Sequence, residues 1–325
     1  MNKLIGILMA TYNGEKYISE QIDSILNQTY KNWQLLIHDD GSSDRTVEIV
    51  KEYIKTYPEK ILLIEDGIKC GGAKENFAHL MQTVKDNFSF DYIMFSDQDD
   101  VWLPNKIEVS LKKIKQLEIK WGKDIPLLVY TDLKVVDKNL KLINKSLWKY
   151  QKVDPSHNTL NRILLQNIVT GCTMLINRKA LDLSLPIPEK AVMHDWWIAL
   201  VVSVFGKMDY LNIPTVLYRQ HGRNDIGAKN WGYFEALKRI FKREEINKFK
   251  KNLVDTIWQA EEFLNTYNEK LDKDIRRILQ IYSNILNYPN FIRLFYIFKY
   301  RLFKNGFLRN LGNIIFMLNL GIKSI

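Results

Sequence analysis

Three carboxylates crowd into the short segment Asp97-Gln98-Asp99-Asp100, which follows an apolar run at residues 91–96. Because like charges repel, this cluster at the end of a strand predicts a cation that neutralises it. Carboxylate oxygens suit Mg²⁺ or Mn²⁺, and an ion held by one or two carboxylates completes its shell with phosphate oxygens and water. The competing interpretation is a solvated acidic turn that caps the helix beginning near Pro104.

A second acidic segment, residues 39–44 (DDGSSD), also follows an apolar run. A carboxylate of Asp39 or Asp40 can accept the N3–H of a uracil or thymine ring and thereby select the base. Asp44 is well placed to cap the helix that follows. A purely structural turn between strand and helix is the alternative for both Asp39 and Asp40.

Two further segments carry nitrogen groups. The turn Gly71-Gly72 exposes backbone N–H groups before a helix, and Lys74 would add positive charge beside a diphosphate. In residues 218–224 (YRQHGRN), His221 could ligate a metal through a neutral nitrogen, and the two arginines could face phosphates. The alternatives are an ordinary Gly-Gly turn and a structural histidine.

The segment His194-Asp195-Trp196-Trp197 places a carboxylate beside two large aromatic side chains. Such a group can form a partly apolar pocket in which the aromatic faces stack on a sugar ring, with His194 beside them. The Asp195 carboxylate could then act as a general base toward a hydroxyl. The alternative is an aspartate N-cap on a helix at residues 196–205 whose aromatic side chains belong to the core.

These polar segments need elements that bring them together. Apolar runs with strand character alternate with helical periodicity through the first hundred residues, which predicts right-handed crossovers and a mostly parallel sheet. Ligands of such sheets sit beyond the carboxyl ends of the strands. Strands are expected at residues 4–10, 33–38, 61–64, 91–96, 127–136, 172–177 and 215–219, and early helices at 15–27, 44–57 and 75–84.

Charge is distributed unevenly along the 325 residues. The net charge is +10, but residues 231–325 carry 17 Lys and Arg against 9 acidic residues, so the first 230 residues are nearly neutral. This segregation, without a nucleic-acid motif, argues against a nucleic-acid partner and for a localised anionic one. Two cysteines without CxxC spacing favour a reducing compartment, and no apolar window suggests a spanning helix.

The four segments containing Thr11-Tyr12-Asn13, Asp40, Asp97-Gln98-Asp99-Asp100 and His194-Asp195-Trp196-Trp197 occur in an order that closely resembles family 2 glycosyltransferases with the GT-A fold. The Asp-Gln-Asp-Asp-Val-Trp sequence is similar to bacterial rhamnosyltransferases of cell-wall and capsule polysaccharide assembly. The resemblance covers roughly residues 3–225. It implies an α/β catalytic domain at 1–230, followed by an all-helical extension at 231–325.

The resemblance also implies roles at matching positions. Thr11, Tyr12, Asn13 and Asp40 would contact the donor nucleoside, with Lys74 near its diphosphate. Asp97 and Asp99 would form the DxD pair, with Asp99 directly on Mn²⁺ or Mg²⁺, Asp97 supporting it and His221 as a further ligand. Asp195 would be the catalytic base of an inverting transfer. The acceptor pocket would be formed by His194, Trp196 and Trp197.

The family implies a dTDP- or UDP-sugar donor, with dTDP-rhamnose expected and a UDP-hexose as the alternative. A polyprenyl-diphosphate-linked glycan is the expected acceptor. A protein that binds a nucleotide or glycan without catalysis is disfavoured, because the carboxylates expected to bind the metal and the one expected to act as base are all present.

The last 35 residues contain no acidic side chain. Their composition predicts an amphipathic helix on an anionic membrane surface, so the protein is expected in the cytoplasm, peripheral to the inner face of the cell membrane. A helical cap on the catalytic domain or a homodimer contact is the alternative. The basic residues are Arg293, Lys299, Arg301, Lys304, Arg309 and Lys323, interleaved with Phe291, Phe295, Tyr296, Phe298, Tyr300, Phe303, Phe307 and Phe316.

Overall fold

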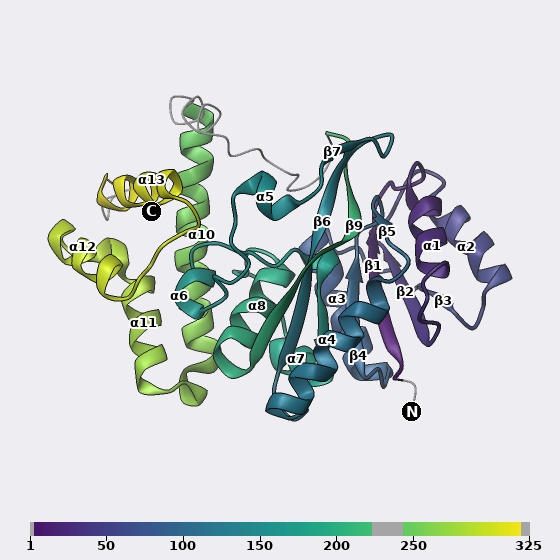
Figure 1. Ribbon diagram of the computed structural model, residues 1–325, viewed down its shortest axis with the longest axis horizontal. Helices are drawn as coiled ribbons and strands as arrows, with labels where there is room; N and C mark the ends of the chain where they lie inside the picture. The colour runs from purple at the N-terminus through teal and green to yellow at the C-terminus, as the bar shows by residue number, and fades with distance from the viewer. Residues whose placement is uncertain (1–2, 223–242, 320–325) are drawn as a thin grey trace.

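The computed structural model describes residues 3–222 and 243–319, and its strands form one nine-stranded sheet within them (Figure 1). The first half of the sheet is parallel and has the order β3-β2-β1-β4. Thr11 pairs with Asp39 at the ends of β1 and β2, so the loops that follow these strands emerge side by side. The four strands are β1 (Ile5–Thr11), β2 (Trp33–Asp39), β3 (Ile61–Ile64) and β4 (Tyr92–Ser96).

Helices connect these strands as the sequence predicts, and the predicted α/β fold class is confirmed. Each helix is apolar on one face, which it buries against the sheet. The first helix begins three residues later than expected, because residues 14–17 form a turn in which Tyr17 N–H donates to the Gly14 carbonyl. The connecting helices are α1 (Ile18–Leu26), α2 (Thr46–Thr56) and α3 (Ala73–Asn87).

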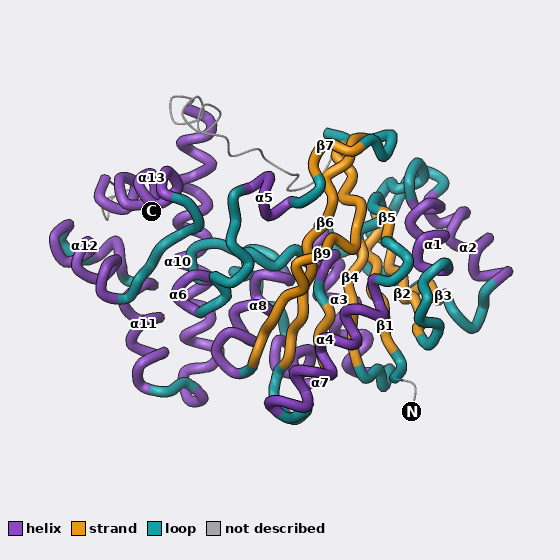
Figure 2. The backbone as a smooth tube through the Cα atoms, in the orientation of Figure 1, coloured by secondary structure: helices purple, strands orange, loops and turns teal. Residues whose placement is uncertain are grey.

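The second half of the sheet is mixed, as the strand path in Figure 2 shows. β8 is antiparallel to both β4 and β6, whereas β9 is parallel to β6. The predicted parallel arrangement therefore holds from β3 to β4 and ends there. The remaining strands are β5 (Val101–Trp102), β6 (Leu127–Asp137), β7 (Leu142–Asn144), β8 (Leu175–Asn177) and β9 (Lys207–Gln220).

Helices cover both faces of the sheet, so two hydrophobic cores form. Side chains alternate along β1, and therefore Leu8 joins one core while Ile7 and Met9 join the other. The Leu8 core includes α3, α7 (Arg178–Ser184) and α8 (His194–Phe205), and the opposite core includes α1, α2 and α4 (Lys106–Trp121). Short elements between them are α5 (Leu147–Gln151), α6 (Leu160–Ile163) and the 3-10 turn η1 (Gly171–Thr173).

The C-terminal region is helical, as expected, and packs beside α8 on the left in Figure 1. Trp197 contacts Phe263 and Tyr267, with ring centroids 5.3 and 6.0 Å apart, so both regions share one core. The predicted boundary at 230/231 lies outside the described residues. The elements are α10 (Arg243–Tyr267), η2 (Asn268–Lys270), α11 (Lys273–Ser283), η3 (Ile285–Asn287), α12 (Asn290–Lys299) and α13 (Phe307–Asn319).

The prediction that the basic residues of the tail lie on its surface is wrong for two of them. Arg293 and Arg309 are buried, and their guanidinium groups donate to backbone carbonyls, including Tyr288 O at 2.6 Å and Asn305 O at 3.1 Å. These arginines hold the helices together because each satisfies carbonyls that would otherwise lack donors. Lys323 lies outside the described residues. No helix within the described ranges is long and apolar enough to cross a bilayer.

Candidate active site

Gln98 joins the loop after β4 to the loop after β1. Its side-chain amide donates to Tyr12 O at 2.9 Å and accepts from Tyr12 N–H at 3.0 Å, in the way two strand residues pair. A Cβ at Gly14 would come within 2.2 Å of Gln98 Oε1, so this contact requires glycine there. The loop that carries the carboxylates on either side of Gln98 is thereby fixed to the backbone of Tyr12, whose ring is exposed.

Asp39 has a structural role in the turn between β2 and α2, which was one of the two interpretations of its sequence motif. Its carboxylate accepts hydrogen bonds from Thr11 Oγ1 at 2.8 Å and from the Ser42 backbone N–H at 2.7 Å. Asn13 has φ +48° and accepts from Ser43 N–H at 2.8 Å. The loops after β1 and β2 are therefore hydrogen-bonded to each other through Thr11, which is buried, and Asn13, which is exposed.

Asp40 and Lys74 both face the loops around α3. The Asp40 carboxylate accepts backbone N–H groups from Cys70 and Gly71, the latter at 3.0 Å. Lys74 Nζ donates to Glu189 O at 2.6 Å and pairs with Glu75 at 3.0 Å. Lys74 thus ties the start of α3 to the loop that precedes Asp195 on α8.

Asp99 and His221 meet at the edge of the sheet, as the metal hypothesis requires. Asp99 Oδ2 lies 2.5 Å from His221 Nε2, and both side chains are largely shielded, with 17% and 12% exposure. Tyr17 stacks on the His221 ring with centroids 5.1 Å apart. One carboxylate and one imidazole thereby converge from the ends of β4 and β9.

Arg219 organises this corner and does not face phosphates, which corrects the expectation for this arginine; Arg223 lies outside the described residues. The side chain is 2% exposed. Its guanidinium donates to Asp99 O at 2.8 Å and Lys138 O at 2.8 Å and pairs with Glu20. Its own N–H donates to Asp100 Oδ1 at 3.1 Å. With these donors engaged, Arg219 fixes the backbone that presents Asp99.

Asp97 and Asp100 approach the Cys172 thiol, and one ligand atom from each lies within 4.8 Å of the others. Burial, followed by the charges of Asp99 and Asp97, raises the pKa of Asp100 well above its usual range. Nearby Lys106 is buried over the Trp102 ring, and desolvation lowers its pKa to about 8. Asp99 and His221 offer one carboxylate and one imidazole that could hold a hard divalent cation, whereas among the described residues Asp97 groups with Asp100 and Cys172.

Asp195 has the environment of a general base. The side chain is 7% exposed, and Oδ2 accepts the Gly171 N–H at 2.9 Å while Oδ1 has no hydrogen-bond partner. Burial raises the pKa of this carboxyl to about 7. Asp195 lies in the first turn of α8, and the N-cap is Met193, so the simple capping alternative is wrong.

The structure corrects two members of the predicted acceptor pocket. Trp197 is fully buried, with its ring against Phe263 and Nε1–H donating to Ser184 O at 3.1 Å, so it cannot stack on a sugar. His194 is 4% exposed, and its ring lies 4.1 Å from that of Phe77. Burial lowers the pKa of His194 to about 3. Trp196 is partly exposed; it packs against the same core, and its Nε1–H donates to Ile163 O at 2.6 Å.

The turn η1 joins the two halves of the site. Gly171 binds Asp195, and the next residue, Cys172, lies against Asp97 and Asp100. Asp195 and the acidic cluster are therefore positioned by consecutive residues. Sequence reasoning missed Gln98, Gly171 and Arg219 as positioning residues, since their partners lie far along the chain; the glutamine inside the acidic motif was the only local signal.

Comparisons with known proteins agree with this geometry. The family model described as glycosyl transferase family 2 matches residues 6–182. The chain is 30% identical over 261 residues to the dTDP-rhamnosyl transferase RfbG of Shigella flexneri, covering 76% of this chain and 85% of the relative. It is 32% identical over 195 residues to the E. coli UDP-Glc:alpha-D-GlcNAc-diphosphoundecaprenol beta-1,3-glucosyltransferase WfgD, covering 59% and 68%.

Two solved structures share the fold. S. aureus TarS 1-349 in complex with UDP-GlcNAc aligns with a TM-score of 0.52 at 16% identity, covering 95% of this chain and 90% of that one. The mannosyltransferase PcManGT from Pyrobaculum calidifontis, in complex with GDP-Man and Mn²⁺, aligns with a TM-score of 0.54 at 15% identity, covering 93% and 74%. The chain belongs to glycosyl transferase family 2, and it is a glycosyltransferase with the GT-A fold.

Proposed function

We propose that this enzyme transfers L-rhamnose from dTDP-rhamnose, with inversion, to a hydroxyl of a lipid-linked or growing cell-surface polysaccharide. The observation that carries the proposal is the position of the buried Asp195 carboxylate. Gly171 of η1 donates its N–H to Asp195, and the next residue, Cys172, lies against Asp97 and Asp100. The similarity to a relative named as a dTDP-rhamnosyl transferase supports the choice of donor.

The donor nucleotide would lie over the loops after β1, β2 and β4. Tyr12 offers an exposed ring, and Thr11 and Asn13 shape the surface beneath it. Asp40 would accept the N3–H of the base when it exchanges the N–H groups of Cys70 and Gly71 for that partner. Lys74 would reach the diphosphate from the start of α3 by releasing Glu189 O.

Asp99 and His221 would hold Mn²⁺ or Mg²⁺ directly, and Asp97 would support them from its place near Asp100 and Cys172. A bound ion supplies positive charge that stabilises the departing nucleoside diphosphate. Arg219 keeps Asp99 in place through the Asp99 carbonyl, and it acts as a positioning residue.

Asp195 would take the proton from the acceptor hydroxyl. The acceptor oxygen then forms the new bond to the anomeric carbon, while the bond from that carbon to the diphosphate oxygen breaks and the nucleoside diphosphate leaves with the electron pair. Attack from the face opposite the leaving group inverts the anomeric configuration. The free Oδ1 of Asp195 is the acceptor for this proton, since Oδ2 is held by Gly171.

A UDP-hexose donor is the second candidate. The similarity to WfgD, which is named for UDP-Glc, favours it, and the N3–H that Asp40 would read is common to uracil and thymine. A donor panel decides between the two. Nucleoside diphosphate release is measured with dTDP-rhamnose, UDP-glucose and UDP-galactose, with Mn²⁺ or excess EDTA, for the wild type and Asp195→Asn.

The proposal expects turnover of dTDP-rhamnose that requires Mn²⁺ or Mg²⁺ and Asp195. Faster turnover of a UDP-hexose than of dTDP-rhamnose would show that the donor is the UDP-hexose. Donor binding with no release in the presence of lipid-linked acceptors would instead identify a non-catalytic nucleotide-binding protein. Full activity in excess EDTA would remove the metal from the proposal.

We further propose that α12 and α13 dock the enzyme on an anionic membrane, where a polyprenyl-diphosphate-linked acceptor would reside. Phe291, Phe295 and Phe298 of α12 recur on one helical face and are 72%, 57% and 61% exposed. On α13, Phe307, Leu311 and Ile315 recur in the same way and are exposed.

The opposite faces of these helices bury polar side chains beside the apolar Ile297 and Met317. Arg309 and Asn313 of α13 are buried, as is Arg293 of α12. The apolar side chains therefore point outward where a lipid surface would cover them, and burial of each would contribute about 1.5–3 kcal/mol. Exposed Lys299 and Arg301 lie next to Phe298 in the chain and would meet anionic headgroups.

A further inference from the structure

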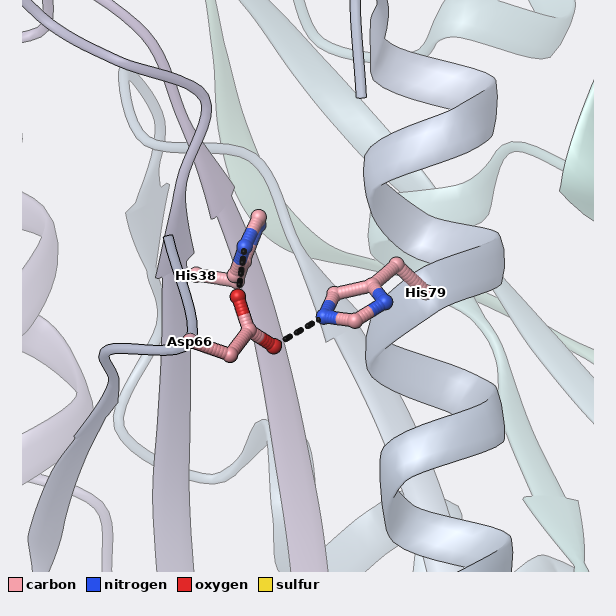
Figure 3. A group of neighbouring side chains, drawn as sticks. All are labelled: His38, Asp66 and His79. Carbon is pink, nitrogen blue, oxygen red and sulfur yellow. Dashed lines mark hydrogen bonds and ion pairs between the residues drawn. The ribbon is translucent and has the colours of Figure 1, made fainter. Parts of the chain in front are cut away.

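A second group of side chains with metal-binding character lies outside the catalytic cluster, between β2 and α3. His38, Asp66 and His79 each offer one ligand atom, and these atoms lie within 4.8 Å of one another. Figure 3 shows both imidazoles turned toward the same carboxylate, with His38 on β2, His79 on α3 and Asp66 on the loop between β3 and α3.

The tautomer of His38 follows from its surroundings. Asn76 Nδ2 donates to the His38 carbonyl at 3.2 Å, which leaves Asn76 Oδ1 facing His38 Nδ1 at 2.8 Å. Because Oδ1 can only accept, Nδ1 carries the proton. In neutral His38, Nε2 therefore presents a lone pair, and it lies 3.5 Å from Asp66 Oδ1.

Two electron-rich atoms face each other at that place. The His38 side chain is almost fully buried, so its nitrogen is out of contact with bulk water, while the Asp66 carboxylate is 33% exposed. A cation between the two would convert repulsion into attraction. On the other side of the carboxylate, His79 Nε2 lies 2.6 Å from Asp66 Oδ2. The group thus converges on one position from three separate elements.

We propose that His38, Asp66 and His79 bind a late first-row divalent cation of the Zn²⁺ type, at a site distinct from the catalytic metal. Two imidazole nitrogens and one carboxylate suit zinc far better than Mg²⁺ or Ca²⁺, which prefer oxygen ligands. The Asn76 hydrogen bond to the far nitrogen of His38 is the outer contact that orients a metal-binding histidine. Water would complete a four-coordinate shell.

The distances between the three ligand atoms allow zinc to bind with little movement of the side chains. Ligand atoms around a tetrahedral zinc ion lie about 3.3 Å apart, close to the 3.5 Å between His38 Nε2 and Asp66 Oδ1. The shorter contact to His79 opens by rotation of a side chain that is 21% exposed. Bound zinc would tether the loop carrying Asp66, and four residues further on Cys70 donates its N–H to Asp40.

Zinc binding by the full-length protein tests the proposal. The protein is treated with EDTA, dialysed and titrated with Zn²⁺ against a competing chelator, and Co²⁺ is used in parallel as a spectroscopic probe. His79→Gln and Asp66→Asn remove one ligand each and lie at accessible positions, so folding should survive. His157→Gln is the matched control, since His157 pairs with Asp154 elsewhere. Asp99→Asn removes a ligand of the proposed catalytic metal site, so it distinguishes binding there from binding at the His38 group.

We expect Asp99→Asn, which lacks a ligand of the catalytic site, still to bind one Zn²⁺ with a rise in Tm and intense visible Co²⁺ bands, and the wild type and His157→Gln to keep this same binding event. His79→Gln and Asp66→Asn should lose at least about tenfold in affinity, together with the Tm rise. Equal zinc affinity in these two variants and the wild type, with unchanged circular dichroism, would overturn the site and leave a proton-shared His-Asp-His group. The titration needs no sugar donor, so its outcome is independent of the proposed function.

Discussion

His221 Nε2 lies 2.5 Å from Asp99 Oδ2, although the histidine follows β9 and the aspartate follows β4. β5 pairs with β9, and this pairing brings the acidic loop beside the end of the long strand. Arg219 then fixes both partners, because it lies two residues before His221 and donates to the Asp99 carbonyl. The relationship turns two weak sequence signals into one candidate ligand pair.

Loss of either partner should weaken metal-dependent activity. We expect His221→Asn to raise the Mn²⁺ concentration for half-maximal activity by at least about tenfold and Asp99→Asn to lower kcat by about 100-fold or more. Nucleoside diphosphate release at varied Mn²⁺ measures both. The loss of activity in the double variant should be smaller than the sum of the losses in the two single variants, expressed as free energies, because the two residues act as a unit.

The exposed carboxylate Asp86 on α3 provides a matched control for these variants. Asp86→Asn should leave the Mn²⁺ dependence unchanged. Additive losses for Asp99→Asn and His221→Asn would mean that the two residues serve different steps.

Asp195 sets a pH limb on activity. A general base works only when ionised, and burial raises the pKa of Asp195 to about 7. We therefore expect kcat/KM to fall about tenfold per pH unit below about pH 7 and to level off above it. Asp195→Glu should keep a limb, whereas residual activity of Asp195→Asn should lack one. A wild-type profile that is flat down to about pH 5 is incompatible with this assignment.

The same burial has a cost in stability. The folded pKa of about 7 lies above the ordinary value of 3.8, so Asp195 favours the folded state fully only below about pH 4, and this contribution is lost as pH rises to about 7. At pH 8, Asp195→Asn should therefore have a higher Tm than the wild type, and its free energy of unfolding should be greater by an amount on the order of a few kcal/mol. Near pH 4 the two proteins should have the same Tm. A lower Tm for Asp195→Asn at pH 8 contradicts the prediction.

Membrane docking should depend on the aromatic face of α12. The triple variant Phe291→Ser, Phe295→Ser, Phe298→Ser should lower partitioning onto anionic vesicles by about tenfold or more in a flotation assay. Because the buried arginines cannot meet lipid, partitioning of the wild type should fall only modestly between about 0.1 and 0.5 M salt.

Ile119→Ser is the matched control for the aromatic variant, since Ile119 is 87% exposed on α4. Equal flotation of the triple variant and the wild type would favour the other occupants of this face, a packed cap or a second copy of the chain. Sedimentation of both proteins at varied concentration distinguishes these two.

The sequence predicted the strand ends well, because apolar runs followed by polar loops have a local signature. It could not say which tryptophan of α8 faces the core, since that helix is apolar on nearly all sides and Trp196 and Trp197 look alike. It also misjudged Arg293 and Arg309, which donate to carbonyls far along the chain, those of Met317 and Lys152 respectively. The His38 group escaped notice because its members lie on three elements.

The three-residue turn η1 also limits how this enzyme can be redesigned. A Cβ at Gly171 would approach His194 Nε2 to 3.1 Å, which is a tight contact, and would come into ordinary contact with Asp195 Oδ2 at 3.5 Å, so a side chain there would first displace the His194 ring beside Asp195. In the proposed mechanism, the residue that activates the acceptor and the acidic cluster near the donor both depend on contacts made by residues 171 and 172. Grafting an acceptor loop from another family member would succeed only if the graft kept this glycine and its neighbour, which makes residues 171–172 a natural seam for engineering new sugar linkages.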